Sequence, residues 1–229
     1  MTAPATTFSL STAWMQTQAF VGANAKRLVL PAAAFLFLPN VIALYFFPQA
    51  EELADLARPE ILLPGIATSI VAVVGQIAIM VLALNPARSE AGALRTGFSY
   101  FVPAVLTTIL TGLAVGIGAI FFILPGLFLA ARLLLGLPII ALGETSPMTA
   151  LSESYRLTGN GAWLRLLAGI MLIVLAAIFL TGVAQLVGGL IDATPPSLPT
   201  ALTVAATSAV VATYTAVFAA TSYKLLRAN

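Results

Sequence analysis

Few side chains in this sequence can do chemistry, because histidine and cysteine are both absent. Histidine is the usual general base and metal ligand, and cysteine supplies thiolates. Hydrolysis would therefore depend on serines or carboxylates. The nearest acidic pair, Glu144 and Glu153, is expected at a solvated interface that supplies few groups to perturb a pKa. No glycine loop for phosphate is present either, so we expect no enzyme, no catalytic residues, no cofactor and no metal site.

Three polar side chains within apolar runs are the candidate ligand-binding residues: Asn40, Arg132 and Gln185. A charge inside a membrane span costs about 3 kcal/mol, which makes Arg132 a candidate for function. In the orientation derived below, all three lie in the outer half of the membrane and could line an outward-facing polar pocket. Two alternatives stay open. Arg132 could snorkel to headgroups or pair with Asp192, and the amides could hydrogen-bond between helices.

The composition indicates what kind of fold must position these residues. Of the 229 residues, 60% are hydrophobic and 8% are charged, with a mean hydropathy of +1.05. A soluble protein carries about 25% charged residues to cover its surface. The net charge of +2 is too small to indicate nucleic-acid binding. We therefore predict an all-α membrane protein that contacts membrane lipids, with a protein partner or a second copy as further candidates.

Six apolar runs are long enough to cross the hydrocarbon core, which takes about 20 helical residues. We predict one transmembrane domain, residues 1–229, with spans at about 28–47, 61–85, 101–123, 127–142, 163–191 and 199–223. The third and fourth spans come from one apolar stretch, and Pro125 and Gly126 mark its expected turn. A re-entrant loop is the alternative there, although about 16 residues after the turn nearly suffice for a crossing.

Charge orients the predicted spans. Eight of the ten basic residues fall on one side, namely Lys26, Arg27, Arg88, Arg95, Arg156, Arg165, Lys224 and Arg227. The other side carries Arg58 among acidic residues, then the uncharged 124–126 turn, then Asp192. Because basic residues favour the cytoplasmic side, we place both termini in the cytoplasm. In a bacterium this membrane would be the inner membrane.

The cytoplasmic segments before the outward-going helices share a pattern. Each has a serine four positions before an alanine, in the pairs Ser9 and Ala13, Ser89 and Ala93, and Ser146 and Ala150. Serine is a favoured helix N-cap, so we interpret each segment as an amphipathic interfacial helix that precedes a transmembrane hairpin. Three such units would give the six spans. Coincidence among common small residues is the alternative.

The third unit resembles a known family. Its residues Leu124-Pro-Gly-Leu-Phe-Leu-Ala-Ala-Arg132, Leu137-Pro-Ile-Ile-Ala-Leu-Gly-Glu144 and Ser146-Pro-Met-Thr-Ala-Leu-Ser-Glu-Ser-Tyr-Arg-Leu-Thr158 resemble YciC-type bacterial inner-membrane proteins. That family is related to the membrane domain found beside glycerophosphoryl diester phosphodiesterases. The resemblance implies a six-helix protein connected with lipids or the envelope. These residues include no phosphodiesterase domain, so we do not expect its chemistry. The weakly basic segment 152–156 also departs from the family, which weakens an argument for anionic lipid.

Small residues predict where helices pack closely. In the last span they recur at alternating steps of three and four, which favours left-handed packing at about +20°. We call this set the small-residue seam: Ala205, Ser208, Ala212, Thr215, Ala219 and Ser222. A hydroxyl stripe that lines a pore is the alternative. Gly112 and Gly116 form a GxxxG pattern that predicts another close contact, and Pro39 beside Asn40 predicts a kink.

These observations favour a non-enzymatic integral membrane protein that acts in envelope or lipid homeostasis, as a partner-binding or regulatory subunit. The alternative is a small transporter or lipid-translocating protein that uses Asn40, Arg132 and Gln185. An outward-facing cavity lined by these side chains would favour transport. Side chains that instead pair from helix to helix would favour the first function.

The orientation can be tested by labelling, because single cysteines can be introduced into a chain that has none. Glu52→Cys and Thr194→Cys should react with an impermeant maleimide applied to the outside of intact cells. Ser89→Cys should react only after the membrane is permeabilised. The opposite labelling pattern would overturn the orientation.

Overall fold

A computed structural model describes residues 8–50, 55, 58–191 and 197–228, and this part of the chain is almost entirely helical, without strands. Six of its helical runs are long and apolar enough to cross a membrane. They are Leu10–Phe46, Pro59–Leu84, Phe101–Phe121, Ile123–Ala141, Ala162–Ile191 and Leu198–Arg227. The prediction of an all-α, multi-pass membrane protein is therefore confirmed.

The first run is made of α1 (Leu10–Ala32), η1 (Ala33–Phe37) and α2 (Leu38–Phe46). The backbone of Asn24 is non-helical, with φ −118° and ψ 15°, so a kink divides α1 into two helices. The helix before this kink precedes the span, as predicted for the first interfacial helix. The kink expected near Pro39 takes the form of the π-helical turn η1. Proline has no N–H to donate to the carbonyl four residues earlier, and π-helical turns commonly absorb such a defect.

The second and third units also begin with separate helices, α4 (Glu90–Ser99) and α8 (Pro147–Leu157). The hydroxyls of Ser89 and Ser146 accept a hydrogen bond from the backbone N–H three residues later, at 3.1 and 3.3 Å. Both serines are therefore helix N-caps, as predicted. The alanine of the pattern is fully buried in all three units, at Ala13, Ala93 and Ala150.

The turn between α5 (Phe101–Phe121) and α6 (Ile123–Leu133) lies at Phe122, so the prediction of a turn at 124–126 is wrong. Pro125 falls in the first turn of α6, where a missing N–H removes no helical hydrogen bond. Gly126 instead lets the two helices approach closely. A Cβ added there would lie 2.9 Å from the backbone nitrogen of Ala119.

The predicted fourth span is two helices, because α6 ends at Leu133 and α7 (Gly136–Ala141) begins after a break. Pro138 lies just inside α7 and cannot donate to the carbonyl of Leu134, which explains why the helix does not continue through this point. Most of α7 is buried, and α3 (Pro59–Leu84) and α8 pack against it.

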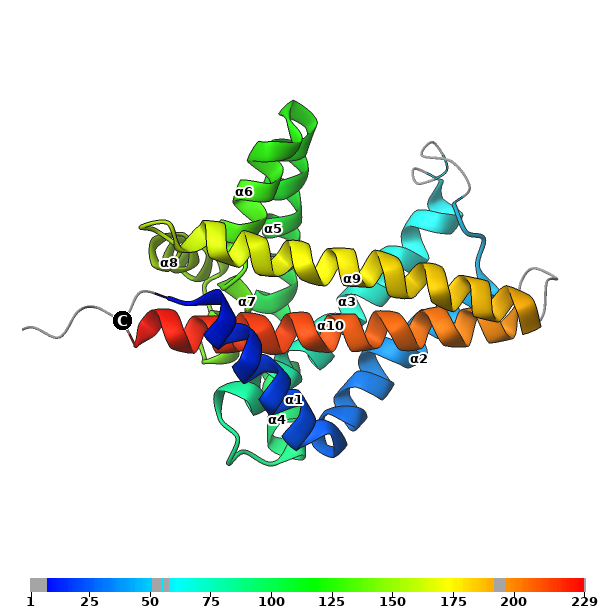
Figure 1. Cartoon of the computed structure of the whole chain (residues 1–229), viewed down its shortest axis with the longest axis horizontal. Coiled ribbons are helices and arrows are strands. Elements are labelled where there is room, and N and C mark those ends of the chain that lie inside the picture. The colour runs from blue at the N-terminus through cyan, green and yellow to red at the C-terminus, as the bar shows by residue number, and fades with distance from the viewer. Residues whose placement is uncertain (1–7, 51–54, 56–57, 192–196, 229) are drawn as a thin grey trace, which may run out of the picture.

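The last helix, α10 (Leu198–Arg227), lies beside α9 (Ala162–Ile191) along the long axis of the molecule (Figure 1). It also packs against α1 and α3. Every member of the small-residue seam is at least half-buried, with Ala205, Ala219 and Ser222 fully buried. The buried face of α10 also includes small residues outside the seam, such as Ala209 and Ala216, and large ones such as Phe218, so the seam is one part of a broad contact surface.

The GxxxG prediction is wrong within this chain. Gly112 and Gly116 are exposed, and no other part of the described chain lies within 4 Å of a Cβ added at either position. The close contact of α5 is made by Gly118, where an added Cβ would lie 3.0 Å from the backbone nitrogen of Gly126.

Basic side chains from α1 and α10 meet at the end of α3. Lys224 donates to the Ala83 carbonyl at 3.0 Å, and Arg27 donates to the Pro86 carbonyl at 2.8 Å. The last carbonyls of a helix have no partner within it, so Lys224 satisfies one of them, and both cations lie near the negative end of the helix dipole. The contacts join α1 and α10 to the loop that leads into α4.

Close packing at the buried end of the small-residue seam can be tested by substitution in α10. Ala219 is 1% exposed, so Ala219→Leu should overpack the contact and lower the free energy of unfolding by about 1–3 kcal/mol. Val210 is 52% exposed, and Val210→Leu should have little effect. Thermal unfolding in detergent measures both variants. Equal midpoints for the two would contradict this packing.

Candidate functional site

Arg132 lies in the last turn of α6, with its guanidinium stacked on aromatic rings. Its Cζ lies 3.6 Å from the ring centroid of Tyr155 and 5.6 Å from that of Phe128. The Phe128 ring also packs edge-on against Trp163, with centroids 4.9 Å apart. We call these four residues the Arg132 cluster. Cation–π contacts hold a guanidinium in place without neutralising it, so the charge stays available to an anion.

The Arg132 side chain has no acidic partner among the residues that the structure describes. No ion pair there includes it, and its Nε is buried without a hydrogen-bond partner. Asp192, the partner considered from the sequence, lies outside the described residues. An unpaired buried donor costs about 1–3 kcal/mol, so the protein does not fully satisfy this guanidinium. The planar guanidinium matches the oxygens of a phosphate or a carboxylate.

The helix α8 is fastened to the break between α6 and α7. The Ser154 hydroxyl donates to the Arg132 carbonyl at 2.8 Å and accepts from the Leu135 N–H at 3.1 Å. The Thr158 hydroxyl reaches the same Arg132 carbonyl at 3.2 Å. Both hydroxyl residues are fully buried. The side chains of α8 therefore satisfy backbone groups that the break would otherwise leave unpaired.

The opposite face of α8 is exposed and charged. Arg156 donates two hydrogen bonds to the Glu153 carboxylate, at 2.6 and 2.8 Å, and these bonds hold the pKa of Glu153 below its ordinary value. The Arg156 side chain is 71% exposed. An exposed guanidinium and a partly exposed carboxylate are far more stable in water or among headgroups than in hydrocarbon. This face of α8 therefore belongs at the membrane surface.

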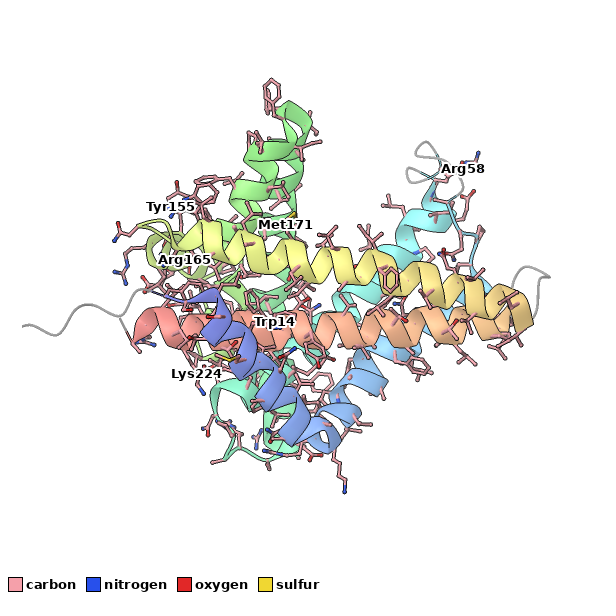
Figure 2. All side chains as sticks on the ribbon, viewed as in Figure 1. Trp14, Arg58, Tyr155, Arg165, Met171 and Lys224 are labelled. Carbon is pink, nitrogen blue, oxygen red and sulfur yellow. The ribbon has the colours of Figure 1, made fainter. Side chains whose placement is uncertain are left out.

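Arg132 must lie close to the same surface, because α8 is bonded to its carbonyl and stacked on its guanidinium. Figure 2 shows Tyr155 near Arg165 at the end of the molecule where α9 begins. This position differs from the predicted one, in the outer half of the membrane near the α5–α6 turn. The depth of Arg132 in the membrane stays a prediction.

The structure does not bring the three predicted ligand-binding residues together. Gln185 is exposed on α9, about 33 Å further along that helix than Trp163 at 1.5 Å per residue. Asn40 is half-buried in α2, whose main neighbours are η1, α3 and α10. The predicted polar pocket of Asn40, Arg132 and Gln185 is therefore wrong.

Sequence reasoning missed the aromatic members of the Arg132 cluster. Phe128 could have been found, because it precedes Arg132 by four positions and so lies on the same helix face. Tyr155 and Trp163 belong to α8 and α9, and only tertiary packing brings them to Arg132. No local spacing in the sequence indicates that contact.

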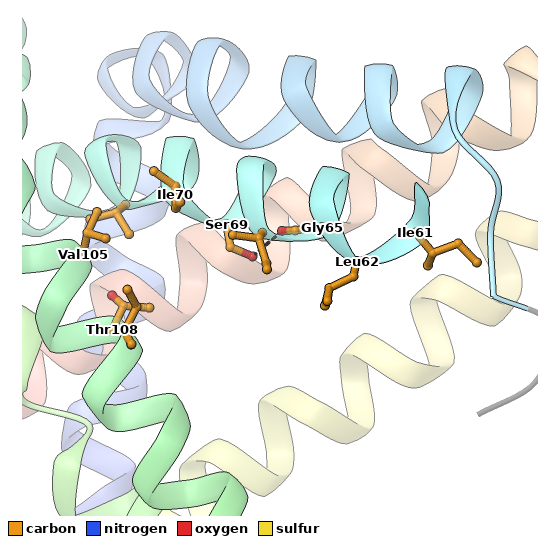
Figure 3. Close-up of a pocket in the computed structure, with 10 residues that line it drawn as sticks. Ile61, Leu62, Gly65, Ser69, Ile70, Val105 and Thr108 are labelled. Carbon is orange, nitrogen blue, oxygen red and sulfur yellow. Dashed lines mark hydrogen bonds between the residues drawn. The ribbon is translucent and has the colours of Figure 1, made fainter. Parts of the chain in front are cut away.

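Two apolar grooves open on the surface of the described structure. The larger, about 480 Å³, lies between α3 and α5 and is lined by residues such as Ile61, Leu62 and Val105 (Figure 3). The hydroxyls of Ser69 and Thr108 on its wall donate to carbonyls of their own helices. A smaller groove of about 280 Å³ lies between α1 and α10. Both grooves suit acyl chains better than polar solutes.

The contact between α8 and the helix break can be tested with a matched pair of variants. Ser154→Ala would leave the Leu135 N–H buried without a partner, so it should lower the free energy of unfolding by about 1–3 kcal/mol. Ser152→Ala removes an exposed hydroxyl that bonds only within α8 and should be neutral. Thermal unfolding in detergent compares them, and a neutral Ser154→Ala would show that these bonds do not hold α8.

Comparison with known proteins assigns no family to this chain. No protein-family model, no curated protein and no solved structure matches it. The resemblance to YciC-type proteins therefore stays a prediction from the sequence. The Arg132 cluster is identified as the candidate site by its own geometry, namely a cation held by aromatic rings at the membrane surface without an acidic partner among the described residues.

Proposed function

We propose that this protein is a non-enzymatic bacterial inner-membrane protein that acts in envelope or lipid homeostasis, with both termini in the cytoplasm. In this proposal the Arg132 cluster binds the phosphate of an anionic lipid in the cytoplasmic leaflet. The observation that carries it is the Arg132 guanidinium, which lies beside the surface helix α8 with a buried, unpaired Nε.

A lipid phosphate fits this position for two reasons. The ligand must be an anion, because the guanidinium is the charge left without a partner in the described part of the site. It must also reach a site at the boundary between water and hydrocarbon, which is where lipid phosphates are held. The apolar grooves add surfaces for acyl chains, although neither groove includes a member of the Arg132 cluster.

A regulatory role is consistent with the position of α8. Its buried face contacts Arg132, whereas its exposed face carries the Glu153 and Arg156 pair. A lipid bound at Arg132 would stabilise α8 through the Tyr155 ring and the shared backbone bonds. A cytoplasmic partner that recognises the exposed face of α8 would then bind better when lipid is present. This coupling would make the protein a partner-binding subunit that reports on anionic lipid.

Transport is the weaker alternative, because it depended on a polar pocket shared by Asn40, Arg132 and Gln185. In the structure Asn40 lies on α2 and Arg132 at the end of α6, near the start of α9. Gln185 lies far along α9 from that start. The two grooves contain none of the three.

Lipid that co-purifies with arginine variants tests the proposal. Charge-assisted hydrogen bonds contribute about 1.5–3 kcal/mol, so Arg132→Gln should lower the bound phosphatidylglycerol about tenfold or more. Arg132→Lys should also bind poorly, because it lacks the planar guanidinium. Native mass spectrometry of the purified protein measures both.

Arg156→Gln is the matched control, since Arg156 is an exposed arginine on the neighbouring helix that already has Glu153 as its partner. It should retain the lipid of the wild-type protein. Wild-type amounts of lipid on Arg132→Lys, or an equal loss on Arg156→Gln, would contradict specific binding at Arg132.

A further inference from the structure

We infer that the hairpin of α5 and α6 is re-entrant. It enters the bilayer from the cytoplasmic face and ends inside the hydrocarbon core, where its tip contacts acyl chains of the cytoplasmic leaflet. We call residues 120–124 the hairpin tip. The inference depends on α8 lying at the membrane surface and is independent of lipid binding at Arg132.

The hairpin tip has the composition of a buried surface, yet it is exposed. Its five residues are 73–84% exposed: Ile120, Phe121, Phe122, Ile123 and Leu124. Residues 112–131 include no polar side chain at all. The start of α3, by contrast, carries Arg58 at its N-cap and Glu60 in its first turn. A turn that emerged into water would expose a large apolar patch, whereas hydrocarbon accepts this tip without cost.

The height of the hairpin above α8 agrees with this placement. The hydroxyls of Ser154 and Thr158 fix α8 at the level of the Arg132 carbonyl. From Arg132, α6 continues only to Ile123, which is about 14 Å at 1.5 Å per residue. The hydrocarbon core is about 30 Å thick, so even an upright α6 would bring the tip no further than about its middle, and a tilted α6 leaves the tip in the cytoplasmic leaflet.

A full crossing would place charges in the core. If the hairpin tip lay at the outer surface, the Arg132 carbonyl would lie near the middle of the bilayer, and α8 would lie there with it. The exposed Glu153 and Arg156 pair would then face hydrocarbon, which is strongly unfavourable. A re-entrant hairpin keeps that pair at the surface.

The arrangement of the helices also separates this hairpin from the crossing helices. Figure 1 shows the α5–α6 hairpin projecting at a wide angle from α9 and α10, so the two pairs cannot both stand along the membrane normal. The helices α9 and α10 have 30 residues each, or about 45 Å, which is enough to cross while tilted. In the hairpin α5 has 21 residues, but α6 has 11, or about 17 Å, which is too short to cross by itself.

The inference keeps the predicted orientation of the termini. Removing two crossings from six leaves an even number, so both ends of the chain stay on one side of the membrane. The protein then has four crossing helices and one hairpin that contacts a single leaflet. Its lipid-facing surface is therefore larger in the cytoplasmic leaflet than in the outer leaflet.

Depth-dependent fluorescence quenching tests this inference. Leu124→Cys is labelled with a fluorophore and reconstituted with lipids that carry a nitroxide either at the headgroup or at the end of an acyl chain. We expect the acyl-end nitroxide to quench the Leu124 label more strongly. Thr149→Cys on the exposed face of α8 is the control, and the headgroup nitroxide should quench its label more strongly. Stronger headgroup quenching at Leu124 would overturn the inference.

A charged substitution gives a second test that does not use a label. Leu124→Lys should lower the amount of membrane-inserted protein relative to Leu124→Ala, because a cation at the tip would lie in hydrocarbon. At an outer surface the lysine would be solvated. Equal inserted amounts of the two variants would overturn the re-entrant placement. A loss of co-purified lipid from Arg132 variants would bear on the proposed function alone.

Discussion

The buried hydroxyl of Ser154 on α8 donates to the carbonyl of Arg132, with the hydroxyl of Thr158 at 3.2 Å from the same carbonyl, and the rest of the site depends on this contact. The bonds satisfy backbone groups at the break between α6 and α7, so α8 cannot move away without leaving them unpaired. Because the opposite face of α8 carries an exposed ion pair, the contact also sets the level of Arg132 relative to the membrane surface.

The position of Arg132 at the membrane surface enters both proposals, but each proposal also rests on a separate observation. At the surface, the aromatic rings of Tyr155 and Phe128 hold the Arg132 guanidinium and leave its charge available, which favours a lipid phosphate. Beyond the surface, α6 has too few residues to cross the bilayer, which favours an apolar hairpin that ends in its core. The first proposal concerns the ligand of Arg132, and the second concerns the depth of the α5–α6 hairpin in the membrane.

The sequence predicted the parts of the fold that depend on local chemistry. Long apolar runs indicated the six helices, and Ser89 and Ser146 indicated helix starts. The break after Leu133 was missed although Pro138 signalled it, because the Pro125-Gly126 pair was the stronger local turn signal. The Arg132 cluster could not be predicted in full, since Tyr155 and Trp163 reach Arg132 only when α8 and α9 fold back onto α6.

The most direct test of the central claim is a depth profile along α6. Spin labels introduced one at a time from Leu133 to Ile123, in a chain without native cysteine, report depth through their relative exposure to oxygen and to a polar relaxation reagent. Our account predicts that depth increases steadily from the Arg132 level to the turn. A depth that reaches its maximum midway and returns to a surface value at Ile123 would contradict it.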